Sequence, residues 1–406
     1  MDNNNHMFNP NTLVNILTLR YDPVIEPNLP KKNWEDFVPT TNPINTDFIE
    51  KSISNTIEQN IELFGDEKIS IALSGGVDST LVLSLIRKIR PEIDIEAISI
   101  KFADSVDETK DAAKIAEKYD ANHNIISLEN YLSELPKAIS IIQLPFWDLH
   151  WYYVVKKSQS LSKILISGDG GDELFGGYTF RYEKFLSITT DTSTPLEKVK
   201  AYLQCHERDR VNDQEKIFNK RSNFSWDYIY DIIKPYFDND LSRLDQVYLA
   251  DYNGKLLYNF NPINSKIINF YNMKMLAPIL NNELLTNATH IPTQQKYDPK
   301  INLGKLPLRK ILKKNNADSL VSGKKLGFNV NTINLWKSHG HNLCHQFLDK
   351  SRVVEDGWIN NEWIKKYIDK SDLDVKYVNK FLGILAVEIW YRLFVTKEIS
   401  SEDTLD

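Results

Sequence analysis

Two glycine-rich segments of the chain carry the residue types that bind phosphate and magnesium. The first is Ser74-Gly75-Gly76-Val77-Asp78-Ser79-Thr80, and the second is Ser167-Gly168-Asp169-Gly170-Gly171-Asp172-Glu173-Leu174-Phe175-Gly176-Gly177-Tyr178. Glycines permit tight turns in which successive backbone N–H groups point at one anion. Carboxylates are the oxygen ligands that magnesium prefers. A turn with a purely structural role rarely needs so many glycines beside three acids, so the second segment in particular indicates a site.

The first segment is not a Walker A loop, because it lacks the GxxxxGK[ST] spacing and its lysine. The segment is nevertheless suited to bind phosphate by the same kinds of interaction as a Walker A loop. The helix that follows adds a positive end, and Ser74, Ser79 and Thr80 offer hydroxyl donors to a phosphate. Asp78 is a candidate ligand for the accompanying magnesium. The alternative is an ordinary strand-to-helix turn with a serine N-cap.

The elements that position these loops alternate between strand and helix. Four apolar runs predict strands, at Lys68–Leu73, Ile95–Phe102, Asn124–Ser127 and Lys163–Ser167. Each glycine-rich segment starts where a predicted strand ends. Alternation of this kind predicts an α/β fold with a doubly wound, mostly parallel sheet, in which ligands bind at the carboxyl ends of the strands.

Helical periodicity is predicted over residues 49–64, after the first loop through Ile89, and near Tyr131–Ile142. Ser105 to Glu108 fits a capping box that opens a further helix. After about residue 185 the pattern is helical, and Phe381–Val395, interrupted by Glu388 and Arg392, predicts a buried helix. We therefore expect a loosely ordered arm over residues 1–45, an ATP-binding α/β part over 46–185 and a helical, acceptor-binding lobe over 186–406.

The composition limits the classes of partner and compartment. The net charge of −6 argues against nucleic acid as the main partner. The chain has no run of eighteen apolar residues and no signal-peptide pattern at its start, which predicts no membrane association. Its two cysteines, Cys205 and Cys344, lie far apart and outside any CxxC spacing, so we expect a reducing, cytoplasmic location without structural zinc.

The motifs resemble those of a known family. SGGVDS is similar to the pyrophosphate-binding loop of the N-type ATP pyrophosphatases, and SGDGGDELFGGY resembles the second signature of their asparagine synthetase branch. The stretch Ala97–Ile100, the pair Asp107-Glu108 and His123 look like that family's second strand and DE motif. Lys305–Arg309 and Lys325–Phe328 resemble its KxxLR and KxGF elements. The likeness covers residues 46–400 and weakens after about residue 185.

The resemblance implies a PP-loop fold of the adenine nucleotide α-hydrolase type, with ATP and Mg²⁺ as cofactors. It also implies a reaction in which a carboxylate is adenylated, pyrophosphate leaves and ammonia or an amine displaces AMP. By the same resemblance Asp78 and Asp172 are magnesium ligands, Asp169 receives the incoming nitrogen's proton and Lys325 approaches the α-phosphate. The implied ATP-binding residues are Leu73, Ser74, Gly75, Gly76, Asp78, Ser79, Ile100, Gly168 and Gly170.

Each assignment has a structural alternative. Asp172 and Glu173 are also suited to capping a helix, and Lys325 follows Lys324 in what could be a solvated basic patch. His123 is interpreted as structural. The aromatic residues near Asp148 are candidates either for the acceptor pocket or for the core; they are Trp147, Trp151, Tyr152 and Tyr153.

The chain departs from the family's pattern in two respects: the source of the nitrogen and the elements on the acceptor side. Glutamine-dependent asparagine synthetases start with a catalytic cysteine, whereas this chain starts Met1-Asp2 and has about forty-five residues before the synthetase region. A glutaminase domain does not fit there, although Ile16–Tyr21 looks like the tail of one. We expect the nitrogen to come from free ammonia, a separate glutaminase or an amine. The family's acceptor-side elements are altered around Ser265–Asn281 and at Gln143-Leu144.

The leading hypothesis is therefore an asparagine synthetase-like, ATP-dependent ligase that acts on a small-molecule or peptide carboxylate. The alternative within that chemistry is a specialised amide synthetase or cyclase, of the β-lactam synthetase or lasso-peptide cyclase type, because such relatives keep the ATP half and change the acceptor half. A catalytically idle nucleotide-binding subunit is a second class, and a tRNA-modifying pyrophosphatase is a third. The presence of Asp78, Asp172 and Lys325 favours an enzyme.

Overall fold

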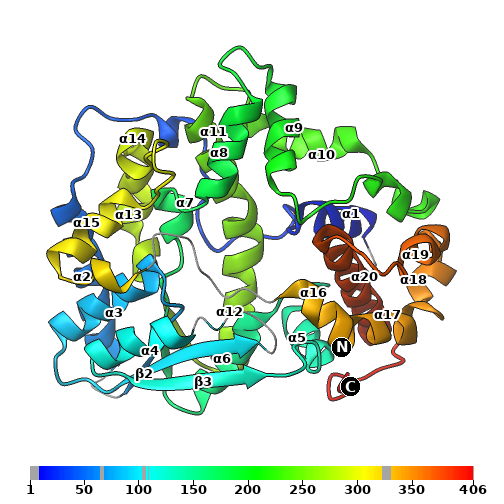
Figure 1. Cartoon of the computed structure of the whole chain (residues 1–406), viewed down its shortest axis with the longest axis horizontal. Coiled ribbons are helices and arrows are strands. Elements are labelled where there is room, and N and C mark those ends of the chain that lie inside the picture. The colour runs from blue at the N-terminus through cyan, green and yellow to red at the C-terminus, as the bar shows by residue number, and fades with distance from the viewer. Residues whose placement is uncertain (1–8, 65–67, 103–106, 108, 322–330, 406) are drawn as a thin grey trace, which may run out of the picture.

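The computed structural model describes residues 9–64, 68–102, 107, 109–321 and 331–405, and the structural statements that follow concern these residues (Figure 1). Their centre is an all-parallel sheet in the order β3-β2-β1-β4-β5. The strands are β1 (Ile69–Ala72), β2 (Ile95–Phe102), β3 (Asn122–Leu128), β4 (Ile164–Ile166) and β5 (Lys274–Leu276). The strand order reverses beside β1, as in a doubly wound sheet. The predicted α/β fold class is confirmed.

The apolar runs form strands because both faces of the sheet centre are covered. Every residue of β1 and β4 is buried, which is why these strands read as apolar runs rather than as an alternating pattern. Ile71 pairs with Ala97 on one side and with Ile166 on the other. β3 forms one edge of the sheet and alternates between partly buried and exposed residues. The central strand, β1, and its neighbour β4 are the two that lead into the glycine-rich loops.

Helices between the strands cover the sheet. α3 (Val77–Ile89) packs on β1, and α4 (Thr109–Lys118) packs on β2 and β3. α6 (His150–Gln159) packs on β2, β3 and β4, while α2 (Thr46–Phe64) packs against α3. The short helices α5 (Leu135–Ile142) and α7 (Gly171–Phe175) complete the α/β part. The connections therefore run strand, helix, strand in the order that the sequence predicts.

The second half of the chain is mostly helical, as predicted. Its helices are α8 (Thr179–Ile188), α9 (Pro195–Cys205), α10 (Trp226–Ile233), α11 (Arg243–Asp251), α12 (Asn261–Phe270), α13 (Asn282–Asn287), α14 (Thr293–Lys296), α15 (Leu306–Lys314), α16 (Thr332–Leu335), α17 (His341–Leu348), α18 (Arg352–Glu355), α19 (Asn361–Tyr367) and α20 (Val375–Phe394). A π-helical segment, Tyr252–Phe260, joins α11 to α12. Figure 1 shows α8 to α11 at the top and α16 to α20 at the right. α20 contains the buried helix that was predicted over 381–395.

Two elements differ from the sequence-based expectation. The arm is not loosely ordered over its described part, because Pro10–Leu19 forms α1, whose residues 13–19 are buried, and α1 packs against α20. The apolar stretch Leu13–Leu19 is therefore the buried part of a packed helix, covered on all sides. The second difference is β5, a three-residue strand from the helical half that extends the sheet beside β4. The predicted capping box at residues 105–108 rests on positions outside the described residues.

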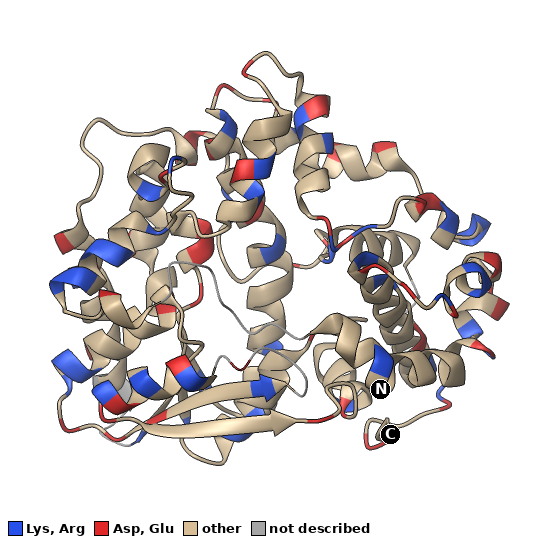
Figure 2. Ribbon diagram, in the orientation of Figure 1, with Lys and Arg blue, Asp and Glu red and all other residues tan. Residues whose placement is uncertain are grey.

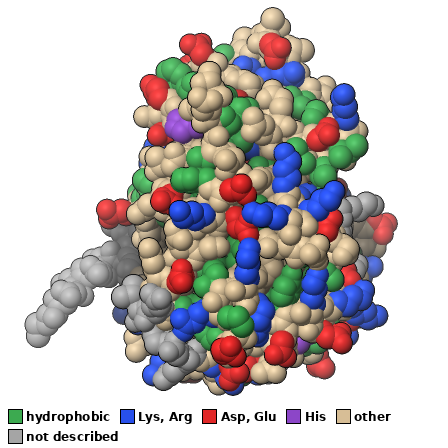
Figure 3. Space-filling model, turned by 90° about the vertical axis from the view of Figure 1, so that its left-hand side faces the viewer, with side chains coloured by type: hydrophobic (Ala, Val, Ile, Leu, Met, Phe, Trp, Pro, Cys, Tyr) green, Lys and Arg blue, Asp and Glu red, His purple; other side chains and the backbone are tan. Residues whose placement is uncertain are grey.

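Charged side chains of both signs are distributed over the surface (Figure 2). On the face that Figure 3 shows, basic and acidic groups are interspersed. Some of them join helices: Glu50 of α2 contacts Lys88 of α3 at 2.8 Å and Lys314 of α15 at 2.9 Å. None of the helices that the structure describes combines the length and the hydropathy that crossing a membrane requires.

Candidate active site

The two glycine-rich loops meet at the carboxyl ends of β1 and β4. These strands are neighbours at the point where the strand order reverses, and a crevice forms there in doubly wound sheets. The loops touch each other at Gly168, where a side-chain Cβ would lie only 2.7 Å from the backbone nitrogen of Ser79. Gly170 has a φ of +93°, and a Cβ there would lie 2.2 Å from Leu280. Glycine at 168 therefore lets the second loop lie against the first, whereas glycine at 170 permits the positive φ and the close approach of Leu280.

A cavity of about 330 Å³ opens between the loops and the helical half. One wall consists of Ala72, residues 74–79 of the first loop and residues 167–173 of the second. The rest of the lining comes from α6, the end of the second loop and the helical half; it consists of His150, Trp151, Gly177, Tyr178, Thr179, Leu256, Phe260, Asn302, Gly304, Lys305 and Arg309. A cavity that combines convergent polar groups with aromatic side chains is the usual form of a small-molecule site.

The first loop is built to face an anion. It leads into the thirteen-residue helix α3, whose N-cap is Gly76. The Ser74 hydroxyl accepts a hydrogen bond from the Gly76 N–H at 3.3 Å, and the Ser79 hydroxyl lies 3.3 Å from the Ser74 nitrogen. The positive end of α3 and these hydroxyl groups line the cavity together, which is an arrangement suited to phosphate oxygens.

Lys305 joins the carboxylates of the two loops. Its Nζ contacts the Asp78 carboxylate and lies 2.8 Å from Oδ1 of Asp172. The three side chains are between 11% and 20% exposed, so solvent screens them only partly. Burial by itself would lower the Lys305 pKa, but Asp172 and Asp78 raise it above its ordinary value. Lys305 is therefore a fixed cation at the point where Asp78 and Asp172 converge.

The backbone holds Lys305 in this place. Lys305 has a φ of +58°, and its N–H donates to the Phe175 carbonyl at 3.1 Å. Asp172 lies on the same short helix, α7, as Phe175, and its carbonyl accepts from the Gly177 N–H at 2.9 Å. These backbone hydrogen bonds, all made by α7 and the residues next to it, thus fix Asp172 and Lys305 relative to each other.

The acidity of Asp169 in the cavity is perturbed by its surroundings. Burial raises its pKa to about 6, and the negative charges of Asp78 and Asp172 act in the same direction. The Asn264 amide lies 3.3 Å from Oδ2 of Asp169. With its amide reversed, Asn264 also donates to the Phe260 carbonyl and accepts from Trp151 Nε1, and its oxygen then faces Asp169. We favour the reversed orientation because it satisfies both amide atoms.

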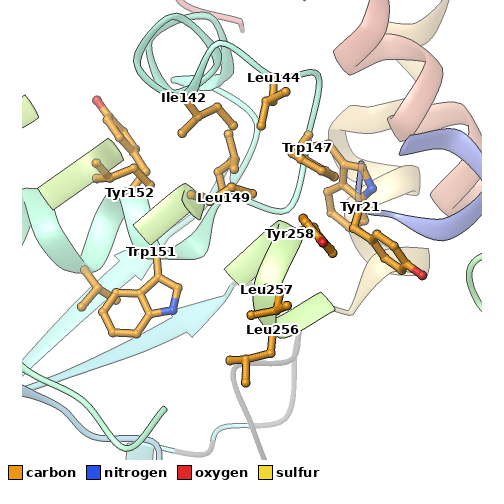
Figure 4. Close-up of a cluster of buried hydrophobic side chains, with 14 of the residues drawn as sticks. Tyr21, Ile142, Leu144, Trp147, Leu149, Trp151, Tyr152, Leu256, Leu257 and Tyr258 are labelled. Atoms are coloured by element: carbon orange, nitrogen blue, oxygen red, sulfur yellow. The ribbon is translucent and has the colours of Figure 1, made fainter. Parts of the chain in front are cut away.

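Part of the remaining lining is aromatic or apolar. Trp151 and Leu256 are buried, and Figure 4 shows them in the same cluster of buried hydrophobic side chains as Trp147 and Tyr258. Tyr178 donates to Glu173, and the Arg181 guanidinium stacks on its ring at 3.7 Å. These contacts fix the Tyr178 ring beside the second loop.

Most of the residues predicted for the site line this one cavity. Its walls include Ser74, Gly75, Gly76, Asp78, Ser79, Gly168, Asp169, Gly170 and Asp172. Leu73 and Ile100 are buried in the sheet region and are not part of the lining. Lys325 lies outside the described residues. Trp151 lines the cavity, whereas Tyr152 and Tyr153 are core residues and Trp147 lies beside Arg20.

Lys305 is the residue that the assignment of roles from sequence missed. It belongs to the KLPLR stretch, whose resemblance to the KxxLR element marked it as a possible site residue. The sequence around this stretch, however, does not indicate that it lies close to the acids of the two loops. Asp148, which lies among the aromatic candidates in the sequence, forms an ion pair with Arg20 of the segment after α1.

The carboxylate pair fits magnesium. Mg²⁺ in nucleotide sites is bound through one or two carboxylates together with phosphate oxygens. Asp78 and Asp172 converge on one cation, the Lys305 ammonium. A Cβ at Gly171 would lie 2.2 Å from the Asp78 carboxylate, and one at Gly177 would lie 1.8 Å from that of Asp172, so the glycines keep both acids accessible.

Residues 55–392 match the family model of asparagine synthase. The chain belongs to the asparagine synthase family. The match includes both glycine-rich loops and the helical half through most of α20.

Two relatives illustrate the extent of the likeness. The chain is 24% identical over 384 residues to glutamine-hydrolyzing asparagine synthetase 1 of Bacillus subtilis, covering 85% of this chain and 59% of that protein. It is 32% identical over 123 residues to the putative glutamine-hydrolyzing asparagine synthetase 2 of Methanocaldococcus jannaschii, covering 29% of this chain and 24% of that protein. The chain thus spans at most about three fifths of the curated relatives it matches.

The solved structure of NMN synthetase from Francisella tularensis aligns over 56% of this chain and 93% of that one, at 17% identity. Its TM-score of 0.27 is too low to support an argument.

Proposed function

We propose that this chain is an ATP-dependent, AMP-forming ligase that adenylates a carboxylate and transfers the acyl group to ammonia or an amine. The observation that carries the proposal is the convergence of Asp78, Asp172 and Lys305 in one cavity at the switch point of the sheet. Two acids and a fixed cation beside a helix N-terminus are suited to a polyphosphate and its counter-ion. The family match and the SGGVDS loop support the same reaction class.

In the proposed first step, a carboxylate oxygen of the substrate attacks the α-phosphorus of ATP. The new P–O bond forms as the bond to the pyrophosphate oxygen breaks, and pyrophosphate leaves. The Lys305 ammonium offsets charge on the departing pyrophosphate. Magnesium, held by Asp78 and Asp172, would supply further positive charge there when bound. Lys325 stays the predicted partner of the α-phosphate.

In the proposed second step, the amine nitrogen attacks the acyl carbon, and the C–O bond to AMP breaks. The nitrogen loses a proton as the amide forms. Asp169 is the proposed acceptor, because it lines the cavity and its pKa of about 6 is close to neutrality. A base whose pKa is near the working pH combines an ionised fraction with a useful affinity for the proton.

We further propose that the acceptor carries an apolar or aromatic body and is not aspartate. Part of the cavity wall is formed by Trp151, Leu256 and Phe260. Among the described lining residues, the lysine and arginine are Lys305, which contacts Asp78 and Asp172, and Arg309, whose Nε donates to the Gly304 carbonyl at 3.1 Å. Aspartate would also need partners for its α-carboxylate and α-ammonium groups. An apolar substrate instead gains from burial on this wall.

The test is pyrophosphate release from Mg-ATP with aspartate and ammonium, and then with a panel of carboxylates that carry aliphatic or aromatic side chains. We expect release with apolar carboxylates, and none with an Asp172→Asn variant that still binds ATP. Asparagine formation from aspartate at comparable kcat/KM would overturn the acceptor proposal and leave the ligase reaction standing. If neither aspartate nor any apolar carboxylate of the panel supported pyrophosphate release, the ligase proposal would be wrong for these substrates.

A further inference from the structure

A group of two histidines and one aspartate lies in the C-terminal helical region, away from the candidate active site. His341 and His345 are one turn apart on α17, and Asp369 follows the end of α19. One ligand atom from each of the three lies within 4.8 Å of the other two. None of them lines the cavity between the loops. Figure 1 shows α17 and α19 together at the right, with α3 and α7 at the left.

The two imidazoles face the same carboxylate oxygen. Nε2 of His345 lies 2.8 Å from Oδ1 of Asp369, and Nε2 of His341 lies 3.3 Å from that same atom. An ordinary ion pair needs only one imidazolium. The two ring centres are 4.7 Å apart, so protonating both rings would place two like charges together. A divalent cation bound by both Nε2 atoms and the carboxylate satisfies all three groups at once.

The spacing is close to that of a tetrahedral zinc site. Zinc–nitrogen and zinc–oxygen bonds of about 2.0–2.1 Å separate adjacent ligands of a tetrahedron by about 3.3 Å. The two nitrogen–oxygen distances, 2.8 and 3.3 Å, already lie near this value. Two imidazoles and one carboxylate are a donor set of borderline type, which zinc accepts and magnesium does not favour. Water completes a site with three protein ligands.

The surroundings orient one ligand ring. Nδ1 of His345 lies 3.3 Å from Oδ1 of Asp349, the residue that directly follows α17 and caps its C-terminal end. A carboxylate on Nδ1 fixes the tautomer that presents Nε2 to a metal. The ring of His341 lies edge-on to Trp336, which is buried and stacks on Phe381 of α20. His341 is thus backed by the core, while all three ligands remain partly exposed to incoming ions.

We propose that His341, His345 and Asp369 form a binding site for zinc or a chemically similar divalent ion, with Asp349 positioning His345. The site joins α17 to the segment after α19, so a bound ion would hold these parts of the C-terminal helices together. Its three residues are not part of the lining of the cavity between the loops, so we assign the site a structural role, separate from the adenylation proposed above.

The experiment uses the full-length, untagged chain after treatment with a chelator, in millimolar Mg²⁺ so that oxygen-only sites are occupied. Zn²⁺ is titrated by calorimetry, and Co²⁺ is titrated by its visible d–d absorption. The variants are the double variant His341→Ala/His345→Ala, the positioning variant Asp349→Asn and the matched control His339→Ala. His339 lies two residues before His341 and is not part of the cluster.

We expect one site that binds zinc at micromolar or lower concentration in the wild type and in His339→Ala. The double variant should lose at least about 100-fold in affinity, and Asp349→Asn about 10-fold, which is the usual range for a partner that orients a ligand. Zinc should raise the Tm of the wild type and leave that of the double variant unchanged. Equal zinc affinity of the wild type and the double variant, or no binding by the wild type below millimolar zinc, would overturn the proposal.

Discussion

Replacing Asp169 by asparagine should stabilise the protein at neutral pH while removing its amide-forming step. The Asp169 carboxyl is held beside Asp78 and Asp172, and burial raises its pKa from 3.8 to about 6. A group whose ionised form is less favourable in the folded state weakens folding wherever that form predominates. Asparagine keeps the size of the side chain and removes the charge. The candidate base is therefore a site where function opposes stability.

The expected gain in the free energy of unfolding follows from the pKa shift of Asp169. A rise of about two pKa units at about 1.36 kcal/mol per unit gives an upper limit of about 3 kcal/mol. Asp169 keeps some exposure to solvent, which screens its charge, so we expect about 1–2 kcal/mol. The sign depends on pH. Below the unfolded-state pKa of about 4, both states are protonated and the penalty is absent. It grows between about pH 4 and 6 and is complete above pH 6.

The assay is urea unfolding of the wild type and Asp169→Asn at pH 7.5 and at pH 4. The variant should be more stable by about 1–2 kcal/mol at pH 7.5, and the difference should shrink to a few tenths at pH 4. The control is Asp372→Asn, because Asp372 is exposed on the surface; its effect should be small at both pH values. A variant that is less stable at pH 7.5, or equally affected at both pH values, would refute the reasoning.

The same variant separates the two chemical steps. Asp169→Asn should still release pyrophosphate with a suitable carboxylate, but it should not form the amide. In the wild type, amide formation should fall as the pH drops through about 6, because the base becomes protonated. Loss of both steps together would show that Asp169 does not act as the base.

Three further predictions concern ion pairs and the metal. Asp172→Asn should lower pyrophosphate release by about 100-fold or more without changing the circular dichroism spectrum; unchanged turnover would exclude Asp172 from the site. Removal of divalent ions by a chelator should stop pyrophosphate release and added Mg²⁺ should restore it; release in the chelator would contradict the metal assignment. Arg181→Met should cost about 3–5 kcal/mol in urea unfolding, because Arg181 lies 2.8 Å from the buried Asp251 and its loss leaves that carboxylate without its arginine. The double variant Arg181→Met/Asp251→Leu should recover most of that loss, and equal stability of the single and double variants would argue against this account.

The fold of the α/β part was largely predictable because its signals are local. The strands β1, β2, β3 and β4 all lie where apolar runs were found, with ends that differ by one or two residues. β5 was not predictable, because Lys274–Leu276 is three residues long and forms a strand only by pairing with β4. α1 was misinterpreted for a similar reason. Its asparagine-rich surroundings suggest disorder, but its burial comes from the packing of α20, more than three hundred residues later in the chain.

The sequence by itself determined which local groups could do chemistry. Glycines and acids at the end of an apolar run specify a loop that can approach phosphate, since these properties depend on neighbouring residues. Only the tertiary structure decided which of these groups meet. The strand order makes β1 and β4 neighbours, and the chain brings Lys305 between Asp78 and Asp172. Burial beside those charges then raises the pKa of Asp169. Such effects depend on distances between segments far apart in the chain, which a local motif does not contain.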